Sequence, residues 1–219
     1  MTVLRKLCLT CVSLSLTACT SSGSAIWDSI RGAVRPRSPV DQSTLSRDVS
    51  YLRLLVDGRE VYPALGYIDP QPRGAVEVWY SAGREVLRLQ GGRVAGTAGL
   101  LTEWRQVVLP EFPTWRAMAG GHRWTRVRDV MPGYRMGVTD TLEVRGIPAP
   151  PDVKLTGFEG VALVWFEERA ETAPADPILR LPPARYAVHV DEDGTETVVY
   201  GEQCLAADLC FTWQLWPTS

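Results

Sequence analysis

The sequence predicts a mainly β domain, built as an antiparallel β-sandwich or open barrel-like sheet of about ten short strands with one or two short helices. Apolar and polar residues alternate over short runs such as 86–90. Turn dipeptides separate these runs, as at Asp57-Gly58 and Asp193-Gly194. The chain of 219 residues is also long enough to bury a substantial core.

The first half of the domain is expected to hold two hairpin strands and a three-strand meander. The predicted strands are 49–56, 60–67, 75–80, 85–90 and 93–97. Asp57-Gly58 joins the first two, because this dipeptide tolerates the positive φ values of a tight hairpin. Residues 100–108 break the alternation, so we expect a short helix there that ends before Pro110.

The second half predicts six further strands, namely 122–130, 134–144, 161–166, 186–190, 195–200 and 210–215. The first two form a strand pair around Pro132-Gly133, in which Trp124 and Val127 are expected to point inward and several arginines outward. The run 161–166 is the most apolar of the mature chain, which suits a strand covered on both faces. Residues 170–184 are rich in Pro and Ala and predict a loop or a short helical turn.

The N-terminus has the pattern of a lipoprotein signal peptide. Arg5 and Lys6 precede an apolar stretch of about 12 residues, too short for a transmembrane helix. The stretch ends in Leu-Thr-Ala-Cys at 16–19, which has the form of a lipobox. The alternative is an ordinary secreted protein with a chance cysteine at this place. We expect cleavage before Cys19. Its thiol would then carry diacylglycerol and its amine would carry a further acyl chain, and more than one lipid chain is needed for stable membrane attachment.

The predicted organisation is a signal peptide at 1–18, a lipidated tether at 19–47 with a short helix near 26–34, and a single β domain at 48–219. Thr20 and Ser21 follow the cysteine, where an acidic residue would favour inner-membrane retention. By resemblance to sorted lipoproteins, this favours the outer membrane, with the domain facing the periplasm.

Charge and cysteine usage narrow the function classes. Loss of Arg5 and Lys6 with the signal changes the formal charge from −2 to −4, which excludes a broad basic footprint for nucleic acid. Cys204 and Cys210 remain as a pair, and in an oxidising compartment they predict a disulfide. A metal site is the competing interpretation, but no histidine lies near this pair in the sequence.

No catalytic set is evident, so we expect no enzyme activity, cofactor or metal. Neither His122 nor His189 has metal-ligand spacing, and no serine lies in a G-x-S-x-G motif. The pair Glu167-Glu168 could supply a carboxylate for glycan cleavage. However, adjacent residues of a strand point to opposite faces, which favours a solvated strand end.

Aromatic and arginine residues near predicted loops and strand ends form the candidate contact site. If exposed, they would give a platform for sugar rings or for a protein partner. They are Trp104, Arg105, Trp115, Arg116 and Trp216.

The chain resembles the YjbF/GfcB lipoproteins, which are associated with exopolysaccharide and group 4 capsule loci. The matching residues are Tyr51-Leu52-Arg53-Leu54, Asp57-Gly58, Leu65-Gly66-Tyr67, Trp79, Ala82, Gly83, Gly92-Arg93-Val94, Thr97, Gly99, Leu100, Arg123-Trp124-Thr125-Arg126, Val190-Asp191 and Gly194. They cover most of 48–201, whereas the segment with Cys204 and Cys210 departs from the family pattern.

The resemblance implies a β lipoprotein of the outer membrane that works with other polysaccharide-export proteins, including an outer-membrane β-barrel. Polysaccharide is a further candidate partner, since the protein could act through contacts with partner proteins or with the glycan. The resemblance implies no catalytic residues. We therefore expect a non-enzymatic accessory factor in exopolysaccharide or capsule secretion or assembly. The alternatives are a periplasmic glycan-modifying enzyme, with Glu167, Glu168 or His122 as candidates, and a general envelope-assembly binding protein.

Overall fold

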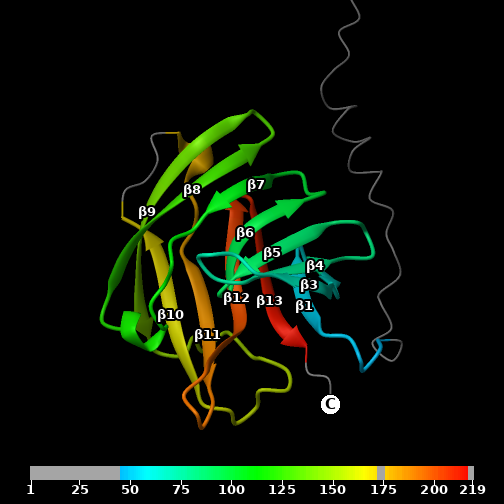
Figure 1. The fold of residues 1–219 in the computed structure, drawn as a ribbon, viewed down its shortest axis with the longest axis vertical. Helices are drawn as coiled ribbons and strands as arrows, with labels where there is room; N and C mark the ends of the chain where they lie inside the picture. Colours follow the sequence, from blue (N-terminus) through cyan, green and yellow to red (C-terminus); the bar gives the residue numbers. More distant parts are fainter. Residues whose placement is uncertain (1–44, 172–175, 217–219) are drawn as a thin grey trace, which may run out of the picture. The chain divides into compact units, whose positions relative to one another are not determined.

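The computed structural model describes residues 45–171 and 176–216, which form a nearly closed antiparallel barrel (Figure 1). The predicted mainly β, barrel-like fold is confirmed. The calls at 1–44, including the signal peptide, the helix near 26–34 and the lipidation of Cys19, lie outside the described residues. Within the described ranges, no helix is long and apolar enough to span a membrane.

The thirteen strands of the described residues belong to one sheet. The first seven are β1 (Tyr51–Val56), β2 (Arg59–Val61), β3 (Ala64–Asp69), β4 (Val76–Tyr80), β5 (Val86–Gln90), β6 (Arg93–Ala98) and β7 (Glu103–Val108). The remaining six are β8 (His122–Met131), β9 (Arg135–Ile147), β10 (Leu163–Ala170), β11 (Ala184–Val190), β12 (Glu196–Ala206) and β13 (Leu209–Trp216). Short 3-10 helices at Arg116–Met118 and Pro177–Leu179 are the helices of the described part.

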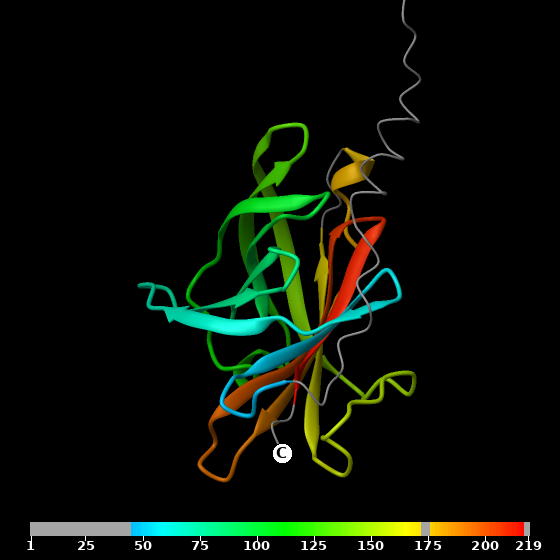
Figure 2. The same cartoon turned by 90° about the vertical axis from the view of Figure 1, so that its right-hand side faces the viewer.

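The sheet runs in the order β6-β5-β4-β3-β1-β13-β12-β11-β10-β9-β8-β7, with β2 paired to β1. The first strand therefore pairs with the last, Leu52 lying opposite Leu215. In Figure 2 the green strands β7–β9 lie on one side, and β1 and β13 lie on the other.

The two edge strands, β6 and β7, meet where the barrel closes. The backbone N–H of Trp104 on β7 donates to Thr97 Oγ1 on β6 at 2.9 Å. Gly96 on β6 also lies beside β7, since a Cβ there would be in van der Waals contact with the Trp104 carbonyl oxygen at 3.4 Å. The edges are thus joined by side-chain contacts, and no ladder pairing between them is present in the described sheet.

The expected helix over 100–108 is wrong, because Glu103–Val108 is strand β7, paired with β8. A register shift between Trp104 and Gln106 changes which side chains face inward. That bulge removes the alternation by which a strand is recognised in sequence. The predicted turn at Asp57-Gly58 is present, with φ values of 50° and 70°.

The core fills the barrel and also covers part of its outer surface. Two interior clusters are centred on Trp79 with Trp213 and on Trp115 with Phe166. A third cluster, with Trp165 and Ala187, lies against hydrophobic residues of 147–163. Adjacent Trp165 and Phe166 are both buried in different clusters, so β10 is covered on both faces at this point.

Candidate functional site

The barrel interior contains a network of charged side chains, which begins on β8. Trp124, Arg126, Arg128 and Val130 alternate along this strand and all are buried, at 5%, 6%, 1% and 5% exposure. The expectation of outward arginines therefore holds for Arg123, whose side chain is 71% exposed, but is wrong for Arg126 and Arg128. The expected shared inward face of Trp124 and Val127 is also wrong. Residues three apart on a strand cannot share a face, whereas residues two apart do.

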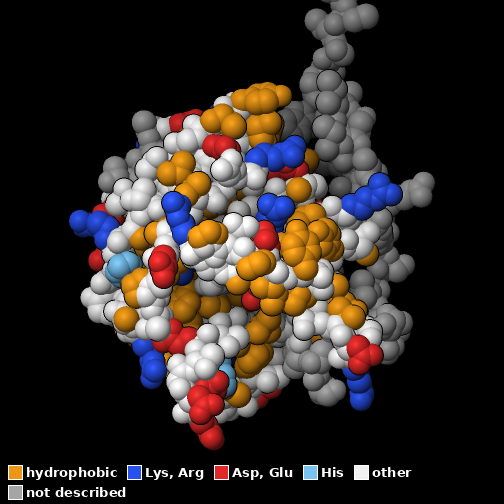
Figure 3. Space-filling view, in the orientation of Figure 1, with side chains coloured by type: hydrophobic (Ala, Val, Ile, Leu, Met, Phe, Trp, Pro, Cys, Tyr) orange, Lys and Arg blue, Asp and Glu red, His pale blue; other side chains and the backbone are white. Residues whose placement is uncertain are grey.

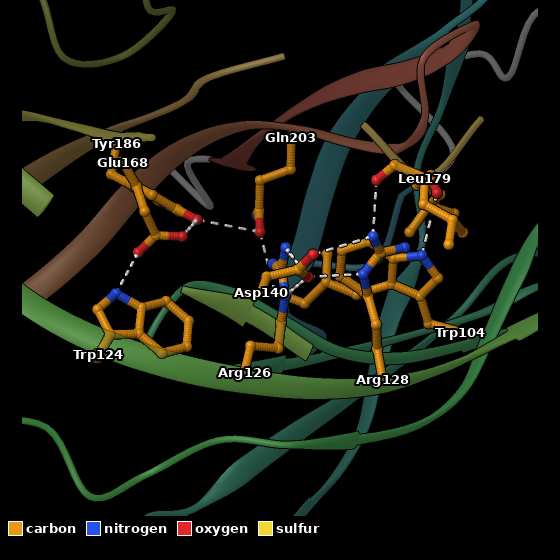
Figure 4. Close-up of polar contacts among 11 residues, drawn as sticks. Trp104, Trp124, Arg126, Arg128, Asp140, Glu168, Leu179, Tyr186 and Gln203 are labelled. Atoms are coloured by element: carbon orange, nitrogen blue, oxygen red, sulfur yellow. Dashed lines mark hydrogen bonds and ion pairs between the residues drawn. The ribbon is translucent and has the colours of Figure 1, made fainter. Parts of the chain in front are cut away.

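Asp140 on β9 binds both arginines. Arg128 Nε lies 2.7 Å and Arg126 Nε 3.0 Å from Asp140 Oδ2, and Arg128 Nη2 also reaches the carbonyl oxygen of Leu179 at 2.8 Å (Figure 4). Burial by itself would raise the pKa of Asp140, but hydrogen bonds and charge from Arg128 and Arg126 outweigh it and lower the pKa. Asp140 is therefore held as a carboxylate.

Glu168 on β10 is the second buried carboxylate, at 3% exposure. It accepts hydrogen bonds from Arg93 Nε at 2.8 Å and from Trp124 Nε1 at 3.1 Å, both at Oε2. The Tyr186 hydroxyl lies 3.4 Å from Oε1. These contacts connect β6, β8, β10 and β11 through one side chain, so Glu168 joins opposite parts of the sheet.

Arg93 lies inside a cage of aromatic rings. Its guanidinium carbon is 4.1 Å from the ring centroids of Phe112 and Trp115, and 5.3 and 5.5 Å from those of Trp124 and Tyr186. Cation–π attraction of this kind strengthens where water is excluded. The cage therefore offsets part of the cost of burying the Arg93 charge.

Gln203 on β12 closes the network. Its Oε1 accepts from the Val94 backbone N–H at 3.0 Å and lies 3.2 Å from the Tyr186 hydroxyl, while its Nε2 donates to the Gly92 carbonyl oxygen at 2.9 Å. Burial, followed by the Glu168 charge, raises the pKa of Tyr186 well above its ordinary value. Tyr186 therefore stays a hydroxyl that donates its proton within the network.

The network holds three arginines and two carboxylates, so its formal charge is +1. Trp104, Arg126, Asp140, Glu168 and Gln203 line a cavity of about 20 Å³. A volume of this size accommodates about one water molecule. The arrangement can therefore fix the geometry of six strands, but a sugar ring does not fit within it.

Two residues of the contact site predicted from sequence are buried, so the expectation that they are exposed is wrong. Trp104 is 1% exposed and donates from Nε1 to the Leu205 carbonyl oxygen, and Trp115 is 6% exposed beside the Arg93 cage. Trp104 is buried because its side chain lies on the face of β7 that points into the barrel. Trp115 is buried because it packs against Phe166 and Tyr186.

The other three predicted contact residues lie nearer the surface but apart from one another in the fold. Trp216 is half-buried at the end of β13 and packs edge-on against Tyr62. Arg105 and Arg116 have side chains 61% and 58% exposed, and each pairs with a glutamate, Glu103 and Glu196 respectively. Their role in binding stays a prediction.

Glu167 and Glu168 point to opposite faces, as strand geometry requires. Glu167 pairs with Arg169 and Arg145 outside the barrel, whereas Glu168 lies in the interior network. The expectation of a solvated strand end is therefore wrong for Glu168, whereas Glu167 faces outward but has a side chain only 14% exposed beside its arginine partners. His122 and His189 are half-buried on β8 and β11, and the described residues contain no group of three His, Cys, Asp or Glu side chains placed to hold a metal.

The predicted disulfide is present. Cys204 and Cys210 are register partners on β12 and β13, with their Cα atoms 3.9 Å apart. The bond therefore joins the two strands across their hairpin.

Comparison with known proteins places the fold. No protein-family model and no curated protein matches the chain. Among solved structures, it is similar to the crystal structure of the hypothetical lipoprotein YmcC from Escherichia coli K12, with a TM-score of 0.61 and 16% sequence identity. The match covers 89% of this chain and 97% of that one. The described domain therefore has the fold of a hypothetical bacterial lipoprotein.

Proposed function

We propose that the protein is a lipid-anchored, non-enzymatic accessory factor of the outer membrane, which assists secretion or assembly of an extracellular polysaccharide by binding partner proteins or the glycan. Its fold likeness to a hypothetical lipoprotein supports the lipoprotein part of this proposal. The lipobox at 16–19 and the resemblance to the YjbF/GfcB lipoproteins support the anchor and the polysaccharide role.

One observation supports the non-enzymatic part most directly. The buried carboxylates of Asp140 and Glu168 are both held by arginines around a cavity of about 20 Å³. Pockets for small-molecule ligands are usually about 300–1,000 Å³. This observation supports a structural role for the interior groups and a binding function for the outer surface.

Deletion of the gene with its neighbours intact tests the proposal. We expect less polysaccharide at the cell surface, with recovery when the wild-type gene is returned. A Cys19→Ala gene should fail to restore it, because the folded protein is then no longer held at the membrane. Unchanged surface polysaccharide after deletion would contradict the proposed role, and full recovery with the Cys19→Ala gene would contradict the role of the anchor.

A glycan-modifying enzyme is the second candidate, since Asp140 and Glu168 both line the interior cavity. Hydrogen bonds and charge from Arg128 and Arg126 lower the pKa of Asp140, which argues against Asp140 as a proton donor. The two functions separate in one assay, in which purified wild-type protein is incubated with the host polysaccharide. New reducing ends or altered chain length would favour the enzyme, whereas an unchanged polymer is expected for the accessory factor.

A further inference from the structure

The outer face of β3, β4 and β5 carries a small aromatic surface beside a cation, which we call the tyrosine platform and define as Tyr67, Tyr80, Val78 and Arg88. Tyr67, Val78 and Arg88 are register partners on three adjacent strands, and Tyr80 lies two residues beyond Val78 on β4. Side chains at these positions share one face of the sheet. The opposite face belongs to the core, so the platform faces outward.

The two tyrosines form an exposed apolar surface. Tyr67 is 47% and Tyr80 43% exposed, whereas Val78 is 1% exposed. Their ring centroids lie 6.5 Å apart with the planes tilted by 38°. Figure 3 shows hydrophobic side chains gathered near Lys or Arg side chains on the face over β4 and β5.

Gly66 gives Tyr80 its position. A Cβ at this glycine would lie 2.4 Å from Tyr80 Cε2 and 2.6 Å from Cδ2, so the ring occupies the space directly over the β3 backbone. One side of the ring is thereby supported by the sheet. The ring is fixed before any ligand arrives, which lowers the entropy cost of binding.

Arg88 supplies the charge of the platform. It is exposed, and none of the ion pairs found among the described residues includes it. Its Cδ lies 3.4 Å from the place of a Cβ on Gly96, its register partner on β6. Its charge still acts on Tyr80, because it opposes the rise in the Tyr80 pKa that burial and Tyr67 cause. A guanidinium is planar and binds a carboxylate through two parallel hydrogen bonds.

We propose that the tyrosine platform binds an acidic saccharide, with the sugar ring on Tyr80 and Tyr67 and a uronic acid carboxylate on Arg88. The size of the surface favours a saccharide, because a stable protein interface buries roughly 800 Å² on each partner and this platform offers two rings. The inference rests on the proposed function only in that an exported glycan would supply the ligand.

Binding of defined oligosaccharides to the full-length acylated protein in detergent tests the platform. The probes are an alginate hexamer, which carries a carboxylate on every sugar, and cellohexaose, which carries none. Calorimetry at low salt should show the alginate hexamer bound more tightly than cellohexaose. Binding should weaken as salt is raised, because the contribution of an exposed charge is screened.

Variants assign the binding to the platform. Tyr80→Leu keeps an apolar side chain at this position but removes the ring, and it should weaken alginate binding by about tenfold, as should Arg88→Gln. Tyr80→Phe should bind as the wild type does, because the ring remains. Matched controls elsewhere are Tyr134→Leu, at a tyrosine 79% exposed, and Arg145→Gln, at an arginine on β9 with a side chain 50% exposed, both expected to leave affinity unchanged.

Three results would overturn the inference. They are no alginate binding by the wild-type protein, equal affinity for cellohexaose, and unchanged affinity in Tyr80→Leu and Arg88→Gln. Loss of binding in the platform variants together with an unaltered deletion strain would support the platform and contradict the proposed function. Unchanged binding in these variants together with loss of surface polysaccharide on deletion would support the proposed function and contradict the platform as a saccharide site. It would favour a protein partner for this face.

Discussion

Glu168→Gln should be among the most destabilising single changes in the barrel interior. The substitution removes a carboxylate that is 2% exposed at its side chain and faces Arg93, which is equally buried. The formal charge of the interior network rises from +1 to +2, and Trp124 Nε1 loses its charged acceptor. Breaking a buried ion pair from one side costs about 3–5 kcal/mol of unfolding free energy.

For a chain of this length, that loss lowers the melting temperature by about 2–4 °C for each kcal/mol, or roughly 6–20 °C in total. Denaturant titration followed by fluorescence of the eight tryptophans measures the free energy, and calorimetry measures the melting temperature. Glu167→Gln is the matched control on the neighbouring residue. Its arginine partners are 50% and 53% exposed, so its loss should cost less than about 1 kcal/mol.

A double change separates the missing charge from a general loss of packing. Replacing Arg93 by Met together with Glu168 by Leu removes both charges, and a buried ion pair can be exchanged for apolar side chains at little cost. This variant should be more stable than Glu168→Gln. Equal stability of Glu168→Gln and Glu167→Gln would refute the reasoning, because it would mean that the buried pair contributes no more than the surface one.

Three further predictions concern other parts of the domain. The arginine partners of Asp140 lower its pKa below the ordinary 3.8, so its carboxylate stabilises the folded domain fully above pH 3.8 and loses this effect as the pH falls through the folded-state pKa. In Asp140→Asn, the free energy of unfolding should therefore depend less on pH in the acid range, as measured by denaturant titration at each pH. The double change Cys204→Ser with Cys210→Ser should lower the unfolding free energy by about 2 kcal/mol, and reductant should act on the wild type alone. Gly92→Ala should destabilise by more than about 1 kcal/mol in denaturant titrations, since φ is +82° and the new Cβ would lie 2.6 Å from Val198 Cγ1.

Much of the strand order along the chain was predictable, because turn chemistry is local. Asp57-Gly58 adopts the positive φ values that its residue types favour, and the strands on each side follow. The strand at β7 was not predictable from alternation, since its bulge places Trp104 inward and leaves Arg105 and Gln106 both exposed. A periodicity test fails wherever an extra residue enters the ladder.

The interior network was missed for a different reason. Arginine is normally a surface residue, so hydrophobicity alone placed Arg126 and Arg128 outside. Their spacing from Trp124 already indicated an inward face, because alternate residues of a strand share a side. The other ion pair of the network could not be found by local reasoning, because Arg93 and Glu168 are 75 positions apart in the sequence.

The pairing of β1 with β13 also affects the order in which the domain can be completed. A chain is made from its N-terminus, so β1 exists long before its neighbour at Leu209–Trp216 has been synthesised. Until then, one edge of β1 has unpaired backbone groups, which is the condition that invites association with other chains. Pairing of this edge of β1 therefore waits for the hairpin of β12 and β13. A truncation within that hairpin would leave β1 without its partner.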